Sequence, residues 1–357
     1  MIVKSVRLKN FRSHEEYFLE CRKSTTLIVG ENGCGKTSVL EAIYEALQGK
    51  SFKAVDREIL RRGTEFYRIE LTYDSGERVV VVYDGVKKRF EVGDKKFGRL
   101  PKKNRYPVVL FLPDDLNLVM ASPSRKRDYF DRSFAQLVEN YGDILRKYEK
   151  ALKQRNELLK MEGVQRGAMF SWNVLLARYG CEVMRWRKGL VEKMNERLTE
   201  VYRTIAENED MIWVEYGGCG MEDGGLDDRG MMGAEKFVEK SGVRGNSLLD
   251  ESEYLRRLEG DFERDRVLGF TSFGVHRDNY SFIFNEVEAE GSASRGEVRS
   301  IVLALKFIEA EMILEGLGRR PVVLLDDVFS ELDEKRQKCL VRNFKGNQVI
   351  ITSVEGV

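Results

Sequence analysis

The stretch Gly30-Glu31-Asn32-Gly33-Cys34-Gly35-Lys36-Thr37 decides the fold. An apolar, β-branched segment, 26–29, precedes it and helix-favouring residues follow it, so the G-x-x-x-x-G-K-T pattern stands between a strand and a helix. Glycines let successive backbone N–H groups curl around a phosphate, and the start of the helix adds partial positive charge. We therefore expect a P-loop in which residues Gly30 to Ser38 hold a nucleotide. Lys36 would reach the β- and γ-phosphates, and Thr37 would offer its hydroxyl to Mg²⁺.

Two acidic residues follow a second apolar segment. Val322 to Leu325 has strand character and ends in Asp326 and Asp327. A P-loop requires one carboxylate near its metal ion and a group that orients the attacking water. We predict that Asp326 binds Mg²⁺ with Thr37, and that Asp327 is the catalytic general base or water-polarising residue beside Lys36. The two motifs lie about 290 residues apart, so an insertion must separate them.

The pattern between these motifs is largely helical. Residues 1–120 have strand character with one early helix, and Asp74-Ser75-Gly76 indicates a hairpin turn. Apolar residues then recur every three or four positions from 130 to 152, which predicts one amphipathic helix, and again from 172 to 205. We expect these two helices to fold back on each other as an antiparallel hairpin.

The chain thus predicts an α/β domain built from both ends, with a helical domain inserted between its halves. Residues 1–120 and 268–357 form the predicted head, and 121–267 form the predicted arm. Between 217 and 245, nine glycines are mixed with charged residues. Because such a composition buries little apolar surface, we expect a linker there.

Composition excludes several classes of protein. The 357 residues are 42% hydrophobic with a formal net charge of +1, which predicts a folded protein without a global field for nucleic acid or membrane. The five cysteines are scattered and unpaired in sequence, and there are only two histidines, so a disulfide framework or zinc site is not expected. No long apolar run is present, and we expect a cytoplasmic protein without a membrane segment.

Further motifs resemble those of the ABC and SMC-like ATPases. Val328-Phe329-Ser330-Glu331-Leu332-Asp333 is similar to their D-loop, and Ser294-Arg295-Gly296-Glu297-Val298-Arg299, at the start of a long helix, resembles their signature motif. Leu8-Lys9-Asn10-Phe11-Arg12-Ser13 is similar to the opening of SMC-like repair ATPases. Within this superfamily the chain most resembles the RecF family. Four segments carry that closer match: Phe111 to Leu116, Ser122 to Asp131, Gln154 to Asn156, and His276 to Asp278.

The resemblance implies a P-loop ABC/SMC-like ATPase head with an inserted helical, short coiled-coil-like arm. It implies ATP and Mg²⁺ as ligands, Arg12 as a nucleotide contact, and an ATP-dependent homodimer. In that dimer, Ser294 and Gly296 of one subunit would cover the γ-phosphate bound to the other, since both stand at a helix start. The family resemblance also implies a weak, DNA-stimulated ATPase associated with the nucleoid, RecO and RecR as partners, and a role in loading RecA at gaps.

Local charge is uneven despite the neutral total. Residues 121–206 carry 18 Lys/Arg against 11 Asp/Glu, whereas 207–265 carry 7 against 17. A basic helical hairpin suits contacts to the phosphate backbone of single-stranded or duplex DNA without reading its sequence, although solvated helix faces give the same pattern. The candidate DNA contacts are Arg125, Lys126, Arg127, Lys147, Lys150, Lys153 and Arg155.

Alternative functions remain open at this stage. One is an ATP-gated clamp in which hydrolysis is incidental, and another is a different SMC-like ATPase that processes DNA ends or acts in defence with a partner subunit. A transporter ATPase is disfavoured by the basic insertion. His276 is interpreted first as a structural, hydrogen-bonded histidine and second as a nucleotide sensor.

Overall fold

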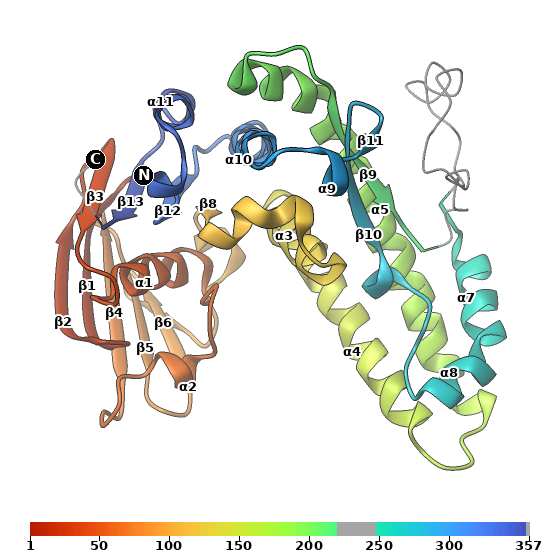
Figure 1. The fold of residues 1–357 in the computed structure, drawn as a ribbon. Coiled ribbons are helices and arrows are strands. Elements are labelled where there is room, and N and C mark those ends of the chain that lie inside the picture. The colour runs from red at the N-terminus through yellow and green to blue at the C-terminus, as the bar shows by residue number, and fades with distance from the viewer. Residues whose placement is uncertain (220–247, 355–357) are drawn as a thin grey trace. The chain divides into compact units, whose positions relative to one another are not determined.

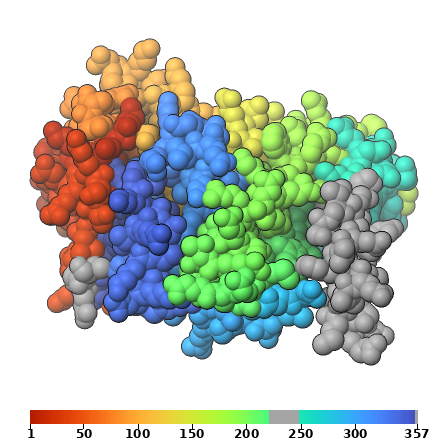
Figure 2. All heavy atoms as spheres, turned by 90° about the horizontal axis from the view of Figure 1, so that it is seen from above, coloured from red at the N-terminus to blue at the C-terminus, as the bar shows by residue number. Residues whose placement is uncertain are grey.

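The computed structural model describes residues 1–219 and 248–354. It divides into two compact units, unit 1 (Met1–Leu116 with Lys306–Val357) and unit 2 (Asn117–Leu305). The second division falls inside one long helix, α10 (Arg295–Leu317). Figure 2 shows N-terminal atoms (red) beside C-terminal atoms (dark blue), so both chain ends contribute to unit 1.

A six-stranded antiparallel sheet forms one layer of unit 1. Its strands, in the order β2-β1-β4-β5-β6-β7, are β2 (His14–Glu20), β1 (Val3–Phe11), β4 (Tyr67–Tyr73), β5 (Arg78–Tyr83), β6 (Lys88–Val92) and β7 (Lys95–Phe97). Every second residue of β4 is buried, as a strand with one core-facing side requires. The predicted turn at Asp74-Ser75-Gly76 is confirmed, because it joins β4 to β5 and Gly76 has φ +86°.

A four-stranded parallel sheet forms the second layer. Its order is β3 (Thr25–Val29), β13 (Val349–Ser353), β12 (Val322–Asp326) and β8 (Val108–Phe111). All residues of β8, β12 and β13 are buried, which explains their continuous apolar runs. This sheet brings the end of β3 and the end of β12 to the same edge, where β13 lies between them.

Helix α1 (Lys36–Gln48) lies between the two sheets (Figure 1) and shares one apolar core with both. Three buried polar residues of α1 find partners in the chain around it. Glu41 pairs with Arg12, Glu45 with Lys88, and the Gln48 side chain donates to the carbonyl of Tyr106. These contacts fix the register of the helix, because each buried polar group would be costly without its partner.

The remaining elements of unit 1 are short, apart from the second half of α10. They are α2 (Asp56–Ile59), the 3₁₀ turns η1 (Lys102–Asn104) and η4 (Phe329–Glu331), and α11 (Glu334–Asn343); another 3₁₀ turn, η2 (Pro113–Met120), crosses the division. In α10, the buried Lys306 donates to the carbonyl of Leu110 and lies 3.2 Å from Asp115. The segment from Phe111 to Leu116 is therefore anchored to α10.

Unit 2 consists of helices and a small antiparallel sheet. The helices are α3 (Pro123–Leu137), α4 (Tyr141–Leu159), α5 (Arg166–Ala206), α7 (Glu251–Gly260), α8 (Phe262–Leu268), α9 (Ala289–Ser292) and the turn η3 (Val275–Arg277). The sheet has the order β11 (Val287–Glu288), β10 (Asn279–Phe284) and β9 (Ile212–Gly217). Helices α4 and α5 are joined by a six-residue connection and pack side by side (Figure 1). This arrangement is the antiparallel hairpin that the sequence predicts.

The prediction of one helix over 130–152 is wrong. The chain leaves helical geometry at Val138, which is extended with φ −112° and ψ 117°, and a new helix begins at Tyr141. The break lets the buried Tyr141 ring meet Phe134 edge-on. The apolar spacing continues across the break, so periodicity alone does not reveal it.

The bounds of the two units differ from the predicted domain bounds at the second junction, which lies after residue 305 and not after residue 267. Residues 268–305 group with unit 2, because β10 pairs along its whole length with β9 and the carboxylate of Asp278 binds Arg187 of α5. The predicted linker at 217–245 lies outside the described residues from 220 onward. Among helices in the described part of the chain, none has the length and apolar character needed to span a bilayer.

Candidate nucleotide-binding site

The P-loop joins β3 to α1, and its glycines have the geometry that the motif demands. Gly33 and Gly35 have φ +83° and +98°, values that favour residues without a side chain. A Cβ at Gly35 would lie 2.5 Å from His14 Nε2, and that nitrogen is hydrogen-bonded to the Gly35 carbonyl at 3.1 Å. The positive φ and the adjacent side chains of His14 and Ser13 both favour glycine at position 35.

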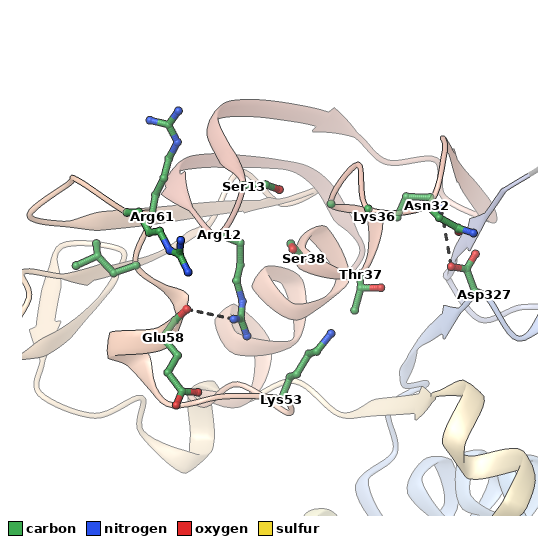
Figure 3. A pocket seen from close by; sticks show the side chains of 14 residues that line it. Arg12, Ser13, Asn32, Lys36, Thr37, Ser38, Lys53, Glu58, Arg61 and Asp327 are labelled. Atoms are coloured by element: carbon green, nitrogen blue, oxygen red, sulfur yellow. Dashed lines mark hydrogen bonds and ion pairs between the residues drawn. The ribbon is translucent and has the colours of Figure 1, made fainter.

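Lys36 places a cation inside the loop. Its Nζ donates to the carbonyls of Gly30 (2.8 Å) and Glu31 (3.1 Å) and lies 3.9 Å from Asp327 Oδ2 (Figure 3). The side chain is 4% exposed. An ammonium held against backbone carbonyls near a carboxylate can transfer these contacts to the oxygens of an incoming phosphate, which is a stronger acceptor.

The two predicted metal ligands lie together. Thr37 Oγ1 is 2.8 Å from Asp326 Oδ1 and 2.9 Å from Oδ2, and Thr352 Oγ1 also donates to Asp326. Burial raises the pKa of Asp326, while the hydrogen bonds from Thr37 and Thr352 oppose that shift. A carboxylate and a hydroxyl at the end of a P-loop are the oxygen ligands that Mg²⁺ prefers. Thr352, on β13, was not predicted because no motif marks it.

Asp327 stands at the pocket in an unusual backbone conformation. Its φ is +48°, and its amide donates to Thr352 Oγ1 at 2.9 Å, which fixes the turn after β12. Asp is one of the few residues that tolerate this left-handed region. Its Oδ1 is buried without a hydrogen-bond partner in the described structure. An unsatisfied carboxylate oxygen beside Lys36 fits a group that orients a water against a phosphate.

Arg12 is held rigidly at the opposite wall. Its guanidinium makes a bidentate contact with the fully buried Glu41, at 2.9 and 2.8 Å, and also donates to the carbonyl of Glu58 (Figure 3). The hydrogen bond with Glu41 raises the pKa of Arg12, so it stays charged. Its backbone has φ +55° and its amide donates to Ile59.

These residues surround a pocket of about 780 Å³. Of the predicted nucleotide contacts, Asn32, Gly33, Gly35, Lys36, Thr37 and Ser38 line it, together with Arg12 and Asp327. Gly30 and Glu31 instead offer their carbonyls to Lys36, and Cys34 is exposed. Six lining residues were not predicted: Ser13, Lys53, Glu58, Leu60, Arg61 and Arg62. Five cations against two acids make the pocket suited to a polyphosphate.

Ser294 stands at the N-terminal end of α10, and Gly296 lies in its first turn. The Ser294 amide donates to Glu297 Oε2, and the Glu297 amide donates to Ser294 Oγ, which forms a reciprocal capping box. Glu297 therefore has a local structural role. Ser294 is exposed and belongs to unit 2, and the trans contact predicted for it stays a prediction.

Two predicted DNA contacts are contradicted by burial. Arg155 is fully buried and donates to Asp265, Thr271, Asn173 and Leu258, so its guanidinium is committed to the core of unit 2. Lys126 is 4% exposed, lies over the Phe282 ring, and has its pKa lowered by burial. Both predictions are wrong because helical periodicity does not show which charged residue faces inward.

The other candidates retain exposure. Lys147, Lys150 and Lys153 are exposed on α4, and Lys147 Nζ lies 5.5 Å from the centre of the Tyr179 ring. Arg125 and Arg127 are half-buried, and Arg127 donates to the carbonyl of Asp278. The three α4 lysines are therefore the most accessible members of the predicted set.

His276 has both ring nitrogens engaged. Nδ1 is 2.7 Å from the Tyr148 hydroxyl, and Nε2 is 3.0 Å from the carbonyl of Thr271. Burial lowers its pKa to about 4. These contacts favour the structural interpretation of His276.

A strand that ends in a P-loop, a helix that begins at its lysine, and a neighbouring strand that ends in two acids define a P-loop ATPase head of the ABC and SMC class. Residues 1–166 match the AAA ATPase domain family. A solved structure of an SMC head bound to the C-winged helix domain of ScpA has a similar fold, with a TM-score of 0.50 and 14% identity over 99% of this chain and 90% of that one.

Whole-chain comparisons give the family. The DNA replication and repair protein RecF of Ruminiclostridium cellulolyticum is 32% identical over 99% of this chain and 92% of its own length, and that of Staphylococcus carnosus is 30% identical over 100% and 95%. A solved structure of the recombination mediator RecF with ATP has a TM-score of 0.83 and 26% identity, covering 99% of this chain and 92% of that one. The chain belongs to the RecF family.

Proposed function

We propose that this protein is an ATP-dependent DNA-binding ATPase of recombinational repair and replication restart. The observation that carries the proposal is that Lys36, Thr37 and Asp327 line one pocket, while Asp326 lies directly behind it, hydrogen-bonded to Thr37. The assignment to DNA repair and replication rests on the family, since the similar proteins of that family are named DNA replication and repair proteins. The substrate is ATP, and the products are ADP and phosphate.

Each residue has a distinct task in this proposal. Lys36 leaves the carbonyls of Gly30 and Glu31 to bind β- and γ-phosphate oxygens, and Arg12 binds the nucleotide from the opposite wall. Thr37 and Asp326 would hold Mg²⁺, which neutralises phosphate charge when bound. Asp327 accepts a hydrogen bond from the attacking water and receives its proton as the water oxygen bonds to the γ-phosphorus. The bond from that phosphorus to the β–γ bridging oxygen breaks, and ADP leaves.

The site is completed by a second subunit. The described residues that line the pocket, among them the P-loop, Arg12 and Asp327, all belong to unit 1. The start of α10, with the exposed Ser294 hydroxyl and Gly296 in the first turn, offers a positive helix end to a γ-phosphate bound by a partner. ATP would thereby favour a homodimer, and dimer closure would clamp DNA.

The exposed lysines of α4 are the proposed DNA contacts of the arm, through the phosphate backbone. A similar solved structure is described as the recombination mediator of the RecFOR pathway. On that basis we propose RecO and RecR as partners, a role in loading RecA at gaps, and a nucleoid-associated position in the cytoplasm.

Turnover and assembly test the proposal together. Phosphate release is measured with and without DNA, and molecular mass is measured by light scattering with ATP, with ADP and without nucleotide. We expect a dimer with ATP only and slow turnover that DNA accelerates. DNA binding with an ATP-dependent dimer but no effect of DNA on turnover would favour an ATP-gated clamp, and loss of ATP-driven dimerisation would exclude both.

A further inference from the structure

A second concentration of positive charge lies in unit 1, away from the P-loop sequence. Residues 87–105 carry nine Lys/Arg against two Asp/Glu, and the eleven residues from 95 onward carry six cations and no acid. This segment contains β6, β7 and η1, and β7 is the outermost strand of the six-stranded sheet. We call residues 87–105 the basic edge; they are drawn in orange in Figure 1.

Part of the basic edge surrounds a pocket of about 460 Å³. Lys87, Lys88, Arg99 and Arg105 line it, together with Gly49 and Gly98. Among the residues that line this pocket, Asp56 is the one acid, and the C-terminal end of α1 at Gly49 adds partial negative charge.

Lys88 compensates for that negative charge. Its Nζ is 2.5 Å from Asp56 Oδ1 and 2.9 Å from the buried Glu45 Oε1, so this one cation already serves two acids. Two further cations of the pocket, Lys87 and Arg99, are therefore in excess over its acids. A cavity with such an excess attracts an anionic ligand.

The excess continues outside the pocket. Lys87, Lys95, Arg99 and Lys103 are exposed, and within the described residues their side chains make no ion pair or hydrogen bond. By contrast, Arg89 pairs with Asp84 and Lys96 pairs with Glu91. Because the unpaired cations extend from the β5–β6 turn to η1, they fit a chain of charges better than one small anion.

The chemistry of the surface favours nucleic acid over protein. From 84 to 105, Val86 is the one large hydrophobic side chain that is strongly exposed, and Phe90 and Leu100 are buried. Protein interfaces have an apolar centre, whereas interfaces with nucleic acid are polar and positively charged. No strongly exposed aromatic ring in this segment offers a base a stacking surface.

We propose that the basic edge binds the phosphodiester backbone of DNA, as a contact separate from the arm lysines. The inference rests on the proposed function, because it names the surface by which the head itself holds the DNA. It predicts binding to mixed-sequence duplexes without base preference and a contribution to the salt dependence of affinity.

The test removes three charges from the full chain. The variant K87Q/R99Q/R105Q is compared with K4Q/K23Q/K345Q, which loses three exposed lysines elsewhere in unit 1. DNA affinity is measured with ATP over a range of salt, on duplex and on single-stranded oligonucleotides. We expect the first variant to bind duplex roughly 10-fold or more weakly at about 0.1 M salt, with a salt slope smaller by about 2 to 3, while the control matches wild type.

A second variant protects the test against a folding defect. K87Q/R99Q/K103Q leaves Arg105 in place, and thermal unfolding with ATP affinity confirms that both variants are folded. Wild-type DNA affinity and salt slope in folded variants would overturn the proposal. If those variants instead lost binding to a poly-glutamate peptide, the surface would belong to an acidic protein partner, which also overturns it. Failure of wild type itself to bind DNA would refute the proposed function, a result distinct from failure of the basic edge.

Discussion

Thr37 and Asp326 are separated by 289 positions in the chain, yet Thr37 Oγ1 lies within 2.9 Å of both carboxylate oxygens of Asp326. The contact joins the P-loop to the end of β12 across the intervening β13. Thr352 of β13 binds the same carboxylate and also fixes the amide of Asp327. Three parallel strands thus position the proposed metal ligands and the proposed water-orienting acid, and such preorganisation would lower the reorganisation that catalysis requires.

Lys36→Ala should abolish ATP-dependent behaviour. The substitution removes the ammonium that would contact the β- and γ-phosphates. From the strength of such charge-assisted contacts we expect ATP affinity to fall roughly 10- to 100-fold and turnover to be lost. Calorimetric titration with ATP and a phosphate-release assay measure both effects. Lys4→Ala, which changes an exposed lysine outside the pocket, is the matched control. Unchanged affinity and turnover in a folded variant would show that this loop is not the ATP site.

Asp327→Asn should separate binding from hydrolysis. Asn adopts the left-handed conformation that Asp327 has at φ +48°, so the turn after β12 should persist. The amide cannot accept a proton from water, and we expect turnover to fall by roughly 100-fold or more while ATP binding and the dimer remain. Single-turnover kinetics with light scattering checks this, with Glu334→Gln on exposed α11 as the control. Wild-type turnover would assign the water-orienting role to another residue.

His276 should make unit 2 sensitive to acid. Burial lowers its pKa from 6.5 to about 4, against the hydrogen bond to Thr271, so between these values the unfolded chain binds a proton that the folded protein does not. The contribution of His276 to the free energy of unfolding is therefore fully present above pH 6.5. It falls as the pH drops toward 4, by on the order of 3 kcal/mol in total. Buried Asp278 acts in the opposite direction, because burial raises its pKa.

Comparison with His276→Gln isolates this effect, since other titrating groups are common to both proteins. Denaturant unfolding at several pH values should give a wild-type stability that falls more steeply than that of the variant between pH 6.5 and 4. Parallel curves over that range would contradict the assigned shift. Arg277 and Arg127, which also disfavour protonation of His276, remain in both proteins.

Replacing Lys147, Lys150 and Lys153 with Glu should weaken DNA binding for all sequences. All three are exposed on α4, and each lost phosphate contact should reduce the salt slope by about one unit. Fluorescence anisotropy with mixed-sequence duplexes at several salt concentrations measures this. A control with Glu at Lys4, Lys23 and Lys345 carries the same change in net charge. Equal affinity and slope in the two variants would place the DNA surface elsewhere.

The sequence predicted those parts of the site that local chemistry determines. The P-loop and Asp326-Asp327 can be recognised in the sequence because the glycines, the lysine and the acids of each motif stand within a few residues of one another. Arg61 and Arg62 were missed because they reach the pocket through a long-range contact, the bridge between Phe11 and Leu60. No spacing in the chain marks such a contact.

The same limit explains the errors in the arm. In the sequence, Arg155 is one more cation on a basic helix. Its partner Asp265 lies 110 residues further along the chain, in the acidic part of the sequence. Likewise, β9 follows the long helix α5 and pairs with β10, and this pairing places residues 268–305 in unit 2. Pairing across long sequence separations depends on tertiary packing, which periodicity does not encode.

Ser294→Arg should leave ATP binding by the monomer near wild type and abolish ATP-driven dimerisation. The P-loop, the acids and Arg12 lie in unit 1 and are untouched. Ser294 is exposed at the start of α10, where a bulky cation would block the approach of a second subunit. ATP binds the dimer better than the monomer in this mechanism, so the ligand itself drives association, whereas ADP lacks the γ-phosphate and should not.

Loss of the helix cap must be distinguished from loss of the trans contact. Ser294→Arg removes the acceptor for the Glu297 amide, at a cost of about 1 kcal/mol. Ser294→Asp keeps an N-cap acceptor but places negative charge where the γ-phosphate would bind, so it should also lose the dimer. Ser294→Thr keeps both the cap and the hydroxyl and should retain it. If the Ser294→Asp variant dimerises like wild type and the Ser294→Arg variant does not, loss of the helix cap or the size of the arginine side chain explains the result. The trans contact is then refuted.

Complementation gives the sharpest form of this prediction. In a mixed dimer of Lys36→Ala and Ser294→Arg subunits, both lesions fall in one composite site, and the other site combines an intact Lys36 with an intact Ser294. Turnover should therefore return in the mixture although neither variant hydrolyses ATP alone. Titration of one variant into the other, followed by phosphate release, measures the recovery. A stable Ser294→Arg dimer with wild-type affinity in the presence of ATP would mean that the start of α10 does not cover the γ-phosphate, and the composite-site mechanism would have to be abandoned.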